Sequence, residues 1–320
     1  MLSPGRLFII LLTGMLLLVA GGCENAPPPN KMQYMKKAEA EAIPSYHFAV
    51  HPLHNPTRLL EAYQPLMDWI NQNTDDFKLV LEASRNYQFY EKKFAAGKPE
   101  ILLPNPWHTL QAQKVGYKVI AMAGEREDFR GIFIARKDSP LQSPLELKGQ
   151  SVSYPSHTAL AACIMPQYFL HQNGIDVLHD IDNHFVGSQE SSIMNVYLGK
   201  VAVAATWPPP WRIFQRDYPD AAAKLKVIWQ TPHLLNNSVM VRNDLPASVA
   251  QTLQQLLLDL DKSEQGRAAL KAMSTKAFYV ADDQTYAEVQ TYVDRFEREV
   301  RQVEDAQGSR GPLTGVDNAL

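Results

Sequence analysis

Polar residues follow several of the expected strands, at the points where helices should begin. The segments are Ser84-Arg85-Asn86-Tyr87, Asn105-Pro106, Ser156-His157-Thr158 and Gly187-Ser188-Gln189. In open α/β sheets, ligands bind beyond the carboxyl ends of the strands. A helix N-terminus at that place offers free N–H donors and a partial positive charge, which suit an anion. Each segment alone is better explained as a helix cap, and only several of them facing one cleft indicate an anion site.

The segment Trp207-Pro208-Pro209-Pro210-Trp211 combines two large aromatic side chains with a stiff backbone. Three prolines restrict the backbone and remove N–H donors. One interpretation is an aromatic wall beside a ligand cleft, and the other is a rigid loop whose Trp side chains are packed inside. With Tyr87, the two Trp rings could also enclose a quaternary amine through cation–π contacts.

Other side chains that could bind a metal or act in catalysis give weaker patterns. The run from His51 to His54 has no carboxylate or Cys at ligand spacing, so no metal site is expected. Ser156 beside His157 lacks a carboxylate partner, so no nucleophile is expected. Cys163 lies in an apolar run, which predicts a buried and inert thiol. The sequence therefore predicts no catalytic residue, no cofactor and no enzyme.

Segments with strand-like and helix-like patterns alternate along the chain. Strands are expected at 47–50, 77–81, 101–103, 118–122, 131–136, 151–154, 182–186, 201–205, 226–229 and 238–242. Helices are expected at 57–71, 87–96, from 106 through 112, at 246–260 and at 285–303. This alternation predicts an α/β fold with mostly parallel sheets. No Gly-rich phosphate-binding pattern is present, which disfavours a nucleotide enzyme.

The composition is that of a packed globular protein. The chain has 320 residues, of which 45% are hydrophobic and 20% charged, so a sizeable core can form. Its formal net charge of −3 indicates no general affinity for nucleic acid.

The N-terminal residues are typical of a secretory signal peptide, expected to be 1–22. Arg6 precedes the apolar run 7–20, which is shorter than the about 20 residues that a spanning helix needs. Cys23 directly after Ala20-Gly21-Gly22 resembles a bacterial lipobox, which implies cleavage before Cys23 and lipidation of that residue. A protein of the cell envelope that faces the periplasm and is anchored to a membrane by lipid is expected, and Glu24 hints at the outer membrane.

Two further segments at the ends are expected to lie outside the folded body. Residues 23–44 contain the Pro27-Pro28-Pro29 triplet and are expected to be a linker between the lipid and the fold. Residues 304–320 are polar and Gly-rich, which predicts a disordered tail.

Longer motifs in the chain resemble the phosphonate-type periplasmic binding proteins of ABC importers. They are Tyr87…Phe94-Ala95-Ala96-Gly97, Asn105-Pro106, the run 145–150 (Leu-Glu-Leu-Lys-Gly-Gln), the run 154–162, the run 186–192 and the segment 206–211 that holds the three prolines. The resemblance covers about residues 45 to 300. It implies a type II fold of two α/β lobes with a ligand cleft between them, lobe 1 from 45–130 plus 236–303 and lobe 2 from 131–235.

The resemblance also implies roles for individual residues. Tyr87 matches the pocket tyrosine of the family, and Ser156 and Thr158, which flank His157, resemble its hydroxyl cluster. Gln189, next to Ser188, occupies a position where many relatives have a His, and Asn105 and Trp107 occupy a turn that often carries an aromatic pocket residue. The ligand-binding residues expected in all are Tyr87, Asn105, Trp107, Ser156, His157, Thr158, Ser188, Gln189, Trp207 and Trp211.

These residues predict a monomeric, lipid-anchored solute-binding protein of an ABC importer. The expected ligand is a phosphonate-like or other small oxyanion, held by neutral donors rather than by salt bridges. Three alternatives remain open from the sequence: a receptor coupled to a membrane sensor kinase, a binder of a quaternary amine, and an enzyme that uses Cys163.

Overall fold

The computed structural model describes residues 42–303. The expected signal peptide, the lipidation site Cys23, most of the 23–44 linker and the 304–320 tail lie outside the described residues. Residues 43–303 belong to one compact unit. Within residues 42–303, none of the helices combines the length and the apolar character that crossing a membrane requires.

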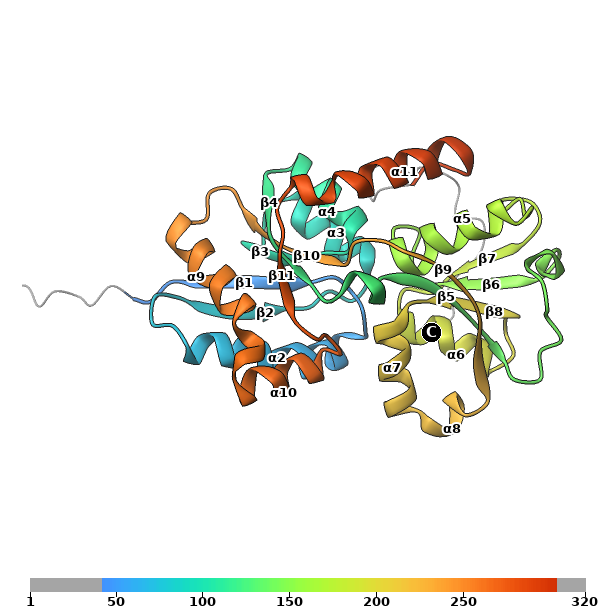
Figure 1. Cartoon of the computed structure of the whole chain (residues 1–320), viewed down its shortest axis with the longest axis horizontal. Coiled ribbons are helices and arrows are strands. Elements are labelled where there is room, and N and C mark those ends of the chain that lie inside the picture. Colours follow the sequence, from blue (N-terminus) through green and yellow to red (C-terminus); the bar gives the residue numbers. More distant parts are fainter. Residues whose placement is uncertain (1–41, 304–320) are drawn as a thin grey trace, which may run out of the picture. The chain divides into compact units, whose positions relative to one another are not determined.

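One of two sheets has six strands in the order β11-β4-β10-β3-β1-β2 (Figure 1). These strands are β1 (Ser45–Val50), β2 (Lys78–Glu82), β3 (Ile101–Leu103), β4 (Tyr117–Ala123), β10 (Asn237–Arg242) and β11 (Phe278–Val280). The other sheet has five strands in the order β7-β6-β8-β5-β9. These are β5 (Arg130–Arg136), β6 (Ser151–Tyr154), β7 (Asp182–Phe185), β8 (Val203–Thr206) and β9 (Leu225–His233).

The chain passes between the sheets twice, through two crossing segments. Residues 124–129 lead from β4 to β5, and residues 234–236 lead from β9 back to β10. The α/β architecture with two sheets is confirmed. The lobe boundaries at 130/131 and 235/236 stay a prediction.

Both sheets are mixed, so the expectation of mostly parallel sheets is wrong. β1 runs parallel to β2 and β3, whereas β10 runs antiparallel to β3 and β4. In the second sheet β6 runs parallel to β7 and β8, whereas β5 runs antiparallel to β8 and β9. The reason is the double crossing: the strands that leave a sheet and return to it are neighbours and therefore run in opposite directions.

Helices cover the sheets (Figure 1). Their bounds are α2 (Pro56–Gln72), α3 (Tyr87–Ala95), α4 (Pro106–Lys114), α5 (Met165–Gln172), α6 (Gln189–Tyr197), α7 (Pro208–Asp217), α8 (Pro219–Ala222), α9 (Ala247–Leu258), α10 (Glu264–Ala272) and α11 (Ala287–Glu299). The short helices are η1 (Arg126–Asp128), η2 (Pro144–Leu147), the π-helix η3 (Leu160–Ile164), η4 (Leu260–Lys262) and η5 (Gln284–Tyr286).

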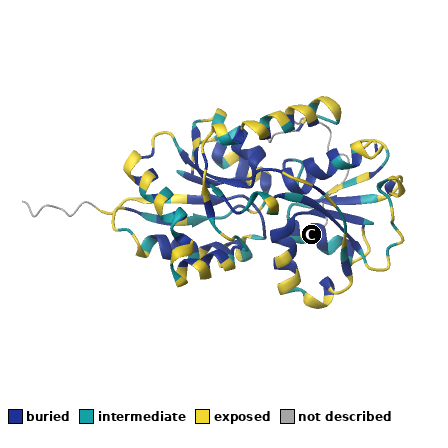
Figure 2. Ribbon diagram, in the orientation of Figure 1, coloured by how far each residue is buried: buried dark blue, intermediate teal, exposed yellow. Residues whose placement is uncertain are grey.

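Amphipathic patterns explain how the helices pack. In α2 the apolar residues recur at helical spacing, and Leu59, Leu66 and Ile70 are fully buried. Figure 2 shows the same division between buried and exposed faces in α10 and α11. The longest helices therefore follow from hydrophobic periodicity alone.

The prolines at 208–210 begin α7 rather than form a loop. Trp207 is at the N-cap position in an extended conformation (φ −144°), and Pro208 to Pro210 form the first turn. Proline suits this place because the first N–H groups of a helix have no partner within it.

Gly131 permits a close approach between β5 and the start of η3. A Cβ added there would lie 2.7 Å from the carbonyl oxygen of Ala161 and 2.8 Å from Cγ of Pro166. The Gly131 amide donates to Oγ1 of Thr231 over 2.9 Å, so the strand cannot shift freely.

We expect Gly131→Ala to lower the free energy of unfolding by about 1–3 kcal/mol, because overpacking forces the backbone to move. Chemical denaturation measures this loss. Gly149→Ala is a comparison that measures backbone strain alone, since its φ of +75° resists a side chain while an added Cβ there meets nothing within 4 Å. An unchanged denaturation midpoint for Gly131→Ala would contradict the close approach.

Candidate functional site

A small cavity lies where residues that follow strands of both sheets meet. We call it the first cavity. Its lining residues are His51, Tyr87, Asn105, Phe129, Ala159, Leu160, Ala161, Ala162, Gln189, Trp207 and Asn237. His51 and Asn105 follow β1 and β3 of one sheet, whereas Gln189 and Trp207 follow β7 and β8 of the other. The cavity therefore occupies the position at which open α/β folds bind ligands.

Leu160, Ala161 and Ala162, at the start of η3, line one wall of this cavity. The amides of Cys163 and Ile164 both donate to the carbonyl oxygen of Ala159, over 2.7 and 3.2 Å. The amides of Leu160, Ala161 and Ala162 come before this first turn closes, so the helix supplies no carbonyl for them. η3 continues directly into α5, which adds the partial positive charge of a helix N-terminus. This wall suits an anion.

The helix begins later than the sequence indicated. Ala159, not a residue of the Ser156-His157-Thr158 segment, is at the N-cap position of η3. Oγ of Ser156 lies 3.1 Å from Oγ1 of Thr158, which donates to Oε1 of Glu91 over 2.6 Å. These hydroxyls bond within the protein, while the backbone after them lines the cavity.

A chain of side-chain hydrogen bonds orients Tyr87. Oγ1 of Thr206 donates to Oε1 of Gln189 over 2.8 Å, and Nε2 of Gln189 donates to the Tyr87 hydroxyl over 3.2 Å. The hydroxyl oxygen thus accepts a bond and leaves its proton to be donated. Burial raises the pKa of Tyr87, so it stays a neutral donor at neutral pH.

His51 is an uncharged ring in the cavity wall. Its Nδ1 lies 2.9 Å from the carbonyl oxygen of Leu103 and must donate to it, because a carbonyl can only accept. Nε2 then carries the lone pair. Burial lowers the pKa of His51 from 6.5 to about 3, against the smaller opposing effect of the Leu103 bond, and the nearby His108 and His54 lower it further.

Asn237 adds an unpaired acceptor. The residue is buried, its amide donates to Oδ1 of Asn236 over 2.8 Å, and its own Oδ1 has no partner among residues 42–303. Such atoms are rare in native proteins and point to an absent ligand or water. None of the lining residues has a formal charge, because His51 and Tyr87 are both neutral. The cavity could hold an anion only through dipoles.

The structure brings four of the ten expected ligand residues into the wall of the first cavity: Tyr87, Asn105, Gln189 and Trp207. The other six do not line it. His157 stacks on Phe185 with ring centroids 3.4 Å apart, and Ser188 caps α6. Ser156 and Thr158 bond as described above.

The two remaining Trp residues are part of the core. Trp107 is buried with its ring centroid 5.2 Å from that of His108. Trp211 stacks on Phe214 in a separate core cluster and so does not face Tyr87 across the first cavity. Ligand contact by any of the ten residues stays a prediction.

Sequence reasoning missed His51 and Asn237 as cavity residues. His51 was considered only as a metal ligand, and its place directly after β1 was the available signal. Asn237 begins β10, at the point where the chain returns from the other sheet, and only the returning crossing segment brings it to the cavity.

Hydrogen bonds on one buried carboxylate join the two sides of the cavity. Oε1 of Glu91 on α3 accepts from Oγ1 of Thr158 over 2.6 Å and from Nε2 of His108 over 2.9 Å. Beside it, Nδ2 of Asn105 donates to the carbonyl oxygen of Thr158 over 3.0 Å. We call these four residues the Glu91 network.

Neither a reactive thiol nor a metal centre is found in the part of the chain that the structure describes. Cys163 is fully buried, and burial raises the pKa of its thiol to about 11. No group of three or more His, Cys, Asp or Glu side chains within residues 42–303 could hold a metal ion.

The family profile described as "ABC transporter, phosphonate, periplasmic substrate-binding protein" matches residues 48–286. The chain belongs to this family. The family consists of binding components of transporters and not of enzymes.

A curated relative is the probable ABC transporter phosphite binding protein PhnD1 of Prochlorococcus marinus, 24% identical over 185 residues. That alignment covers 54% of this chain and 62% of the relative's length.

Two solved structures share the type II fold. A binding protein component of an ABC phosphonate transporter from Pseudomonas aeruginosa superimposes with a TM-score of 0.75 and 16% identity, over 81% of this chain and 88% of its own. PhnD1 of P. marinus in complex with methylphosphonate gives a TM-score of 0.73 and 19% identity, over 80% of this chain and 100% of its own. At these identities the structures support the fold alone.

The buried histidines predict a loss of stability at acid pH. Burial lowers the pKa of His51 to about 3 and that of His54 to about 4, from 6.5. The unfolded chain therefore binds more protons below pH 6.5, and the free energy of unfolding falls by about 1.4 kcal/mol per pH unit for each histidine as the pH falls towards 4.

Urea denaturation at pH 7 and at lower values measures this slope. In the double variant His51→Gln/His54→Gln we expect the fall between pH 6 and 4 to be markedly smaller than in the native protein. The exposed His233, changed to Gln, is the control and should leave the slope unchanged. Equal slopes of the free energy of unfolding against pH in all three proteins would contradict the lowered pKa values of His51 and His54.

Proposed function

We propose that this protein is the periplasmic solute-binding component of an ABC importer for a phosphonate-like oxyanion. The observation that carries the proposal is that Leu160, Ala161 and Ala162, whose amides have no carbonyl partner within η3, line a cavity without formal charge in a member of this family. Tyr87 stands ready to donate a further hydrogen bond. Hydrogen bonds to a charged group contribute about 1.5–3 kcal/mol each, so four such donors would contribute about 6–12 kcal/mol, which must offset the entropic cost of association.

The hydrogen-bond acceptors in the first cavity indicate which protonation state of the ligand fits. Nε2 of His51 carries a lone pair, and Oδ1 of Asn237 is unpaired. Both repel a fully ionised oxygen and favour one that keeps its proton. A monoanion with one P–OH group satisfies donors and acceptors together, which a dianion does not.

The crossing segments supply the hinge of the proposed transport cycle. Gly124 has φ +90°, and an added Cβ there would lie 2.8 Å from Nδ2 of Asn236 in the other crossing segment. Nδ2 of Asn236 donates to the carbonyl oxygen of Glu125 over 2.8 Å. The two segments are thus held together, and rotation about them would open the cavity. The permease would then recognise the form in which the Glu91 network is made.

An oxyanion is favoured over the quaternary amine because Trp211 packs in the core and the cavity has no carboxylate. A receptor coupled to a membrane sensor kinase would use the same cavity with another partner. Neighbouring genes for a permease and an ATPase would indicate the transport function, and a neighbouring kinase gene would indicate the receptor function. A thiol enzyme is disfavoured by the burial of Cys163. The protein is proposed to act as a monomer.

The anchor is part of the proposal. Lipidation of Cys23 would hold the protein at a membrane on the periplasmic side, with the outer membrane as the destination to which Glu24 points. We expect palmitate labelling of cells to mark the native protein and not Cys23→Ala, and fractionation to find the variant in the soluble fraction. A native protein that leaves the membrane in buffer without detergent would contradict the anchor.

The ligand site is tested by calorimetry with methylphosphonate and phosphite. We expect Tyr87→Phe to weaken binding about 10-fold to 100-fold, because one donor to a charged group is lost. Tyr46→Phe, outside the first cavity, is the matched control and should bind as the native protein does. Equal affinities in the two variants would remove Tyr87 from the site, and no binding of any oxyanion to the native protein would refute the proposed function.

A further inference from the structure

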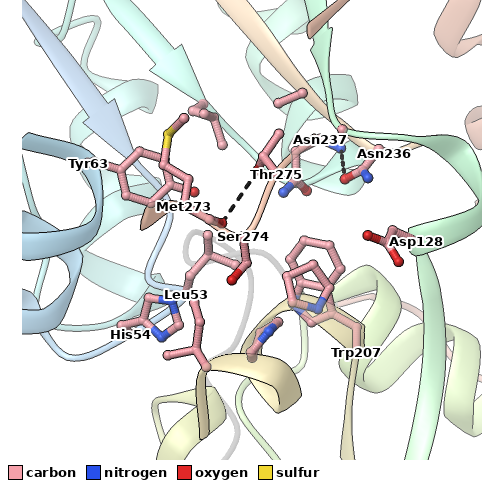
Figure 3. A pocket seen from close by; sticks show the side chains of 16 residues that line it. Leu53, His54, Tyr63, Asp128, Trp207, Asn236, Asn237, Met273, Ser274 and Thr275 are labelled. Carbon is pink, nitrogen blue, oxygen red and sulfur yellow. Dashed lines mark hydrogen bonds between the residues drawn. The ribbon is translucent and has the colours of Figure 1, made fainter. Parts of the chain in front are cut away.

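The residues that line the first cavity have no formal charge, so a full charge that acts on a bound anion must lie behind them. Beside Trp207 the charges are balanced (Figure 3). Asp128 there receives two hydrogen bonds from Arg212, over 3.0 and 2.7 Å. Burial lowers the pKa of His54 to about 4, so this ring is neutral at pH 7. An unbalanced positive charge is found instead behind η3.

Arg301 carries this charge. It follows α11, and its guanidinium donates to Oε1 of Gln167 over 2.8 Å, to the carbonyl oxygen of His157 over 3.3 Å and to Sγ of Cys163 over 3.5 Å. Cys163 comes directly after Ala162, which lines the first cavity. The guanidinium therefore contacts the residue next to the cavity wall.

The helix α11 brings Arg301 to this place from the side of the other sheet. It packs on α4, and Figure 1 shows its C-terminal end beside α5. The ring of Tyr168 on α5 meets that of Tyr292 edge-on, with centroids 5.5 Å apart. The Tyr168 hydroxyl also donates to Oε2 of Glu299 over 2.7 Å. These contacts fix the end of α11 two residues before Arg301.

Within residues 42–303, Arg301 forms no ion pair with a carboxylate. A guanidinium keeps its proton at all ordinary pH values, and its hydrogen bonds go to uncharged acceptors. Its field reaches the interior: burial raises the pKa of the Cys163 thiol, and Arg301 opposes this rise. Burial is also the main cause that raises the pKa of Tyr87, and the Cys163 thiol is a smaller one. The groups that feel Arg301 thus extend to the cavity wall.

We propose that Arg301 is a determinant of anion affinity that acts from behind the cavity wall without touching the ligand. This inference rests on the proposed function and adds a residue to its site. The buried carboxylate of Glu91, which accepts from Thr158 beside the same wall, would repel an anion, and Arg301 offsets that repulsion. Because Arg301 is only partly buried, its charge remains solvated when the cavity is empty.

Calorimetry with methylphosphonate on a charge series at one position tests the inference. Arg301→Lys keeps the charge and should bind within about twofold of the native protein. Arg301→Gln should bind about 3-fold to 10-fold more weakly, and Arg301→Glu should lose a further factor of similar size, because the Coulomb energy is proportional to the charge. All three variants lose the guanidinium hydrogen bonds, so a purely structural role would weaken binding by a similar factor in each.

Two further variants complete the experiment. Arg298→Gln is the matched control, since Arg298 is exposed on α11 and pairs with Glu299, and it should bind as the native protein does. Gln167→Glu places a carboxylate against the Arg301 guanidinium and cancels its charge without removing it. We expect a loss of affinity close to that of Arg301→Gln, and Gln167→Glu replaces that variant if it does not fold.

The outcomes distinguish this inference from the proposed function. If the native protein binds methylphosphonate, equal affinities in the three Arg301 variants overturn the role of Arg301 alone. A lower free energy of unfolding with unchanged affinity would make Arg301 a counter-charge of Glu91 only, which also overturns the inference. Failure of the native protein to bind any oxyanion overturns the proposed function and the inference with it.

Discussion

The geometry of the binding region depends on the hydrogen bonds that Glu91 makes in the interior. A buried carboxylate is stable only when partners replace the water it has lost. Its partners are Thr158, from the loop after β6, and His108, on α4. One interaction thus ties together elements that belong to different sheets and sets the distance across the first cavity. Breaking it would leave a buried charge without compensation, so the walls are held in one arrangement more firmly than apolar packing alone would hold them.

The kinds of group that line the first cavity depend on the position of the Glu91 network. Because Thr158 is engaged by Glu91, the side chains of the Ser156-His157-Thr158 segment are not left to line the cavity, and the backbone of the next residues does so instead. An anion there would be stabilised by amides and a helix dipole, which carry no counter-charge that must itself be neutralised when the cavity is empty. The neutral state of His51 agrees with this, since a cation would be expensive to keep buried without a ligand.

Sequence patterns were sufficient to predict most helices and strands, but insufficient to predict which residues line the first cavity. Periodicity predicted α2 closely, because a helix with one buried face displays that face along the chain. The mixed strand directions were missed because they depend on which strands become neighbours after the double crossing. Of the residues that line the first cavity, Tyr87, Asn105 and Gln189 were predicted from the turns that follow strands, and Trp207 from the segment with three prolines. Asn237 was not found, since it enters the cavity only from a segment that returns from the other sheet.

Trp207 and Trp211 show why spacing alone misleads at a helix start. Residues four apart share a face of a helix, so both rings would be expected on one wall. Trp207, however, is the N-cap residue with φ −144° and ψ 168°, outside the helical range, while Trp211 lies within α7. Their side chains therefore leave the backbone in unrelated directions: Trp211 packs in the core beside Phe214, and Trp207 lines the first cavity. The three prolines between them are what make this possible, because they begin the helix without needing the N–H groups that other residues would leave unpaired.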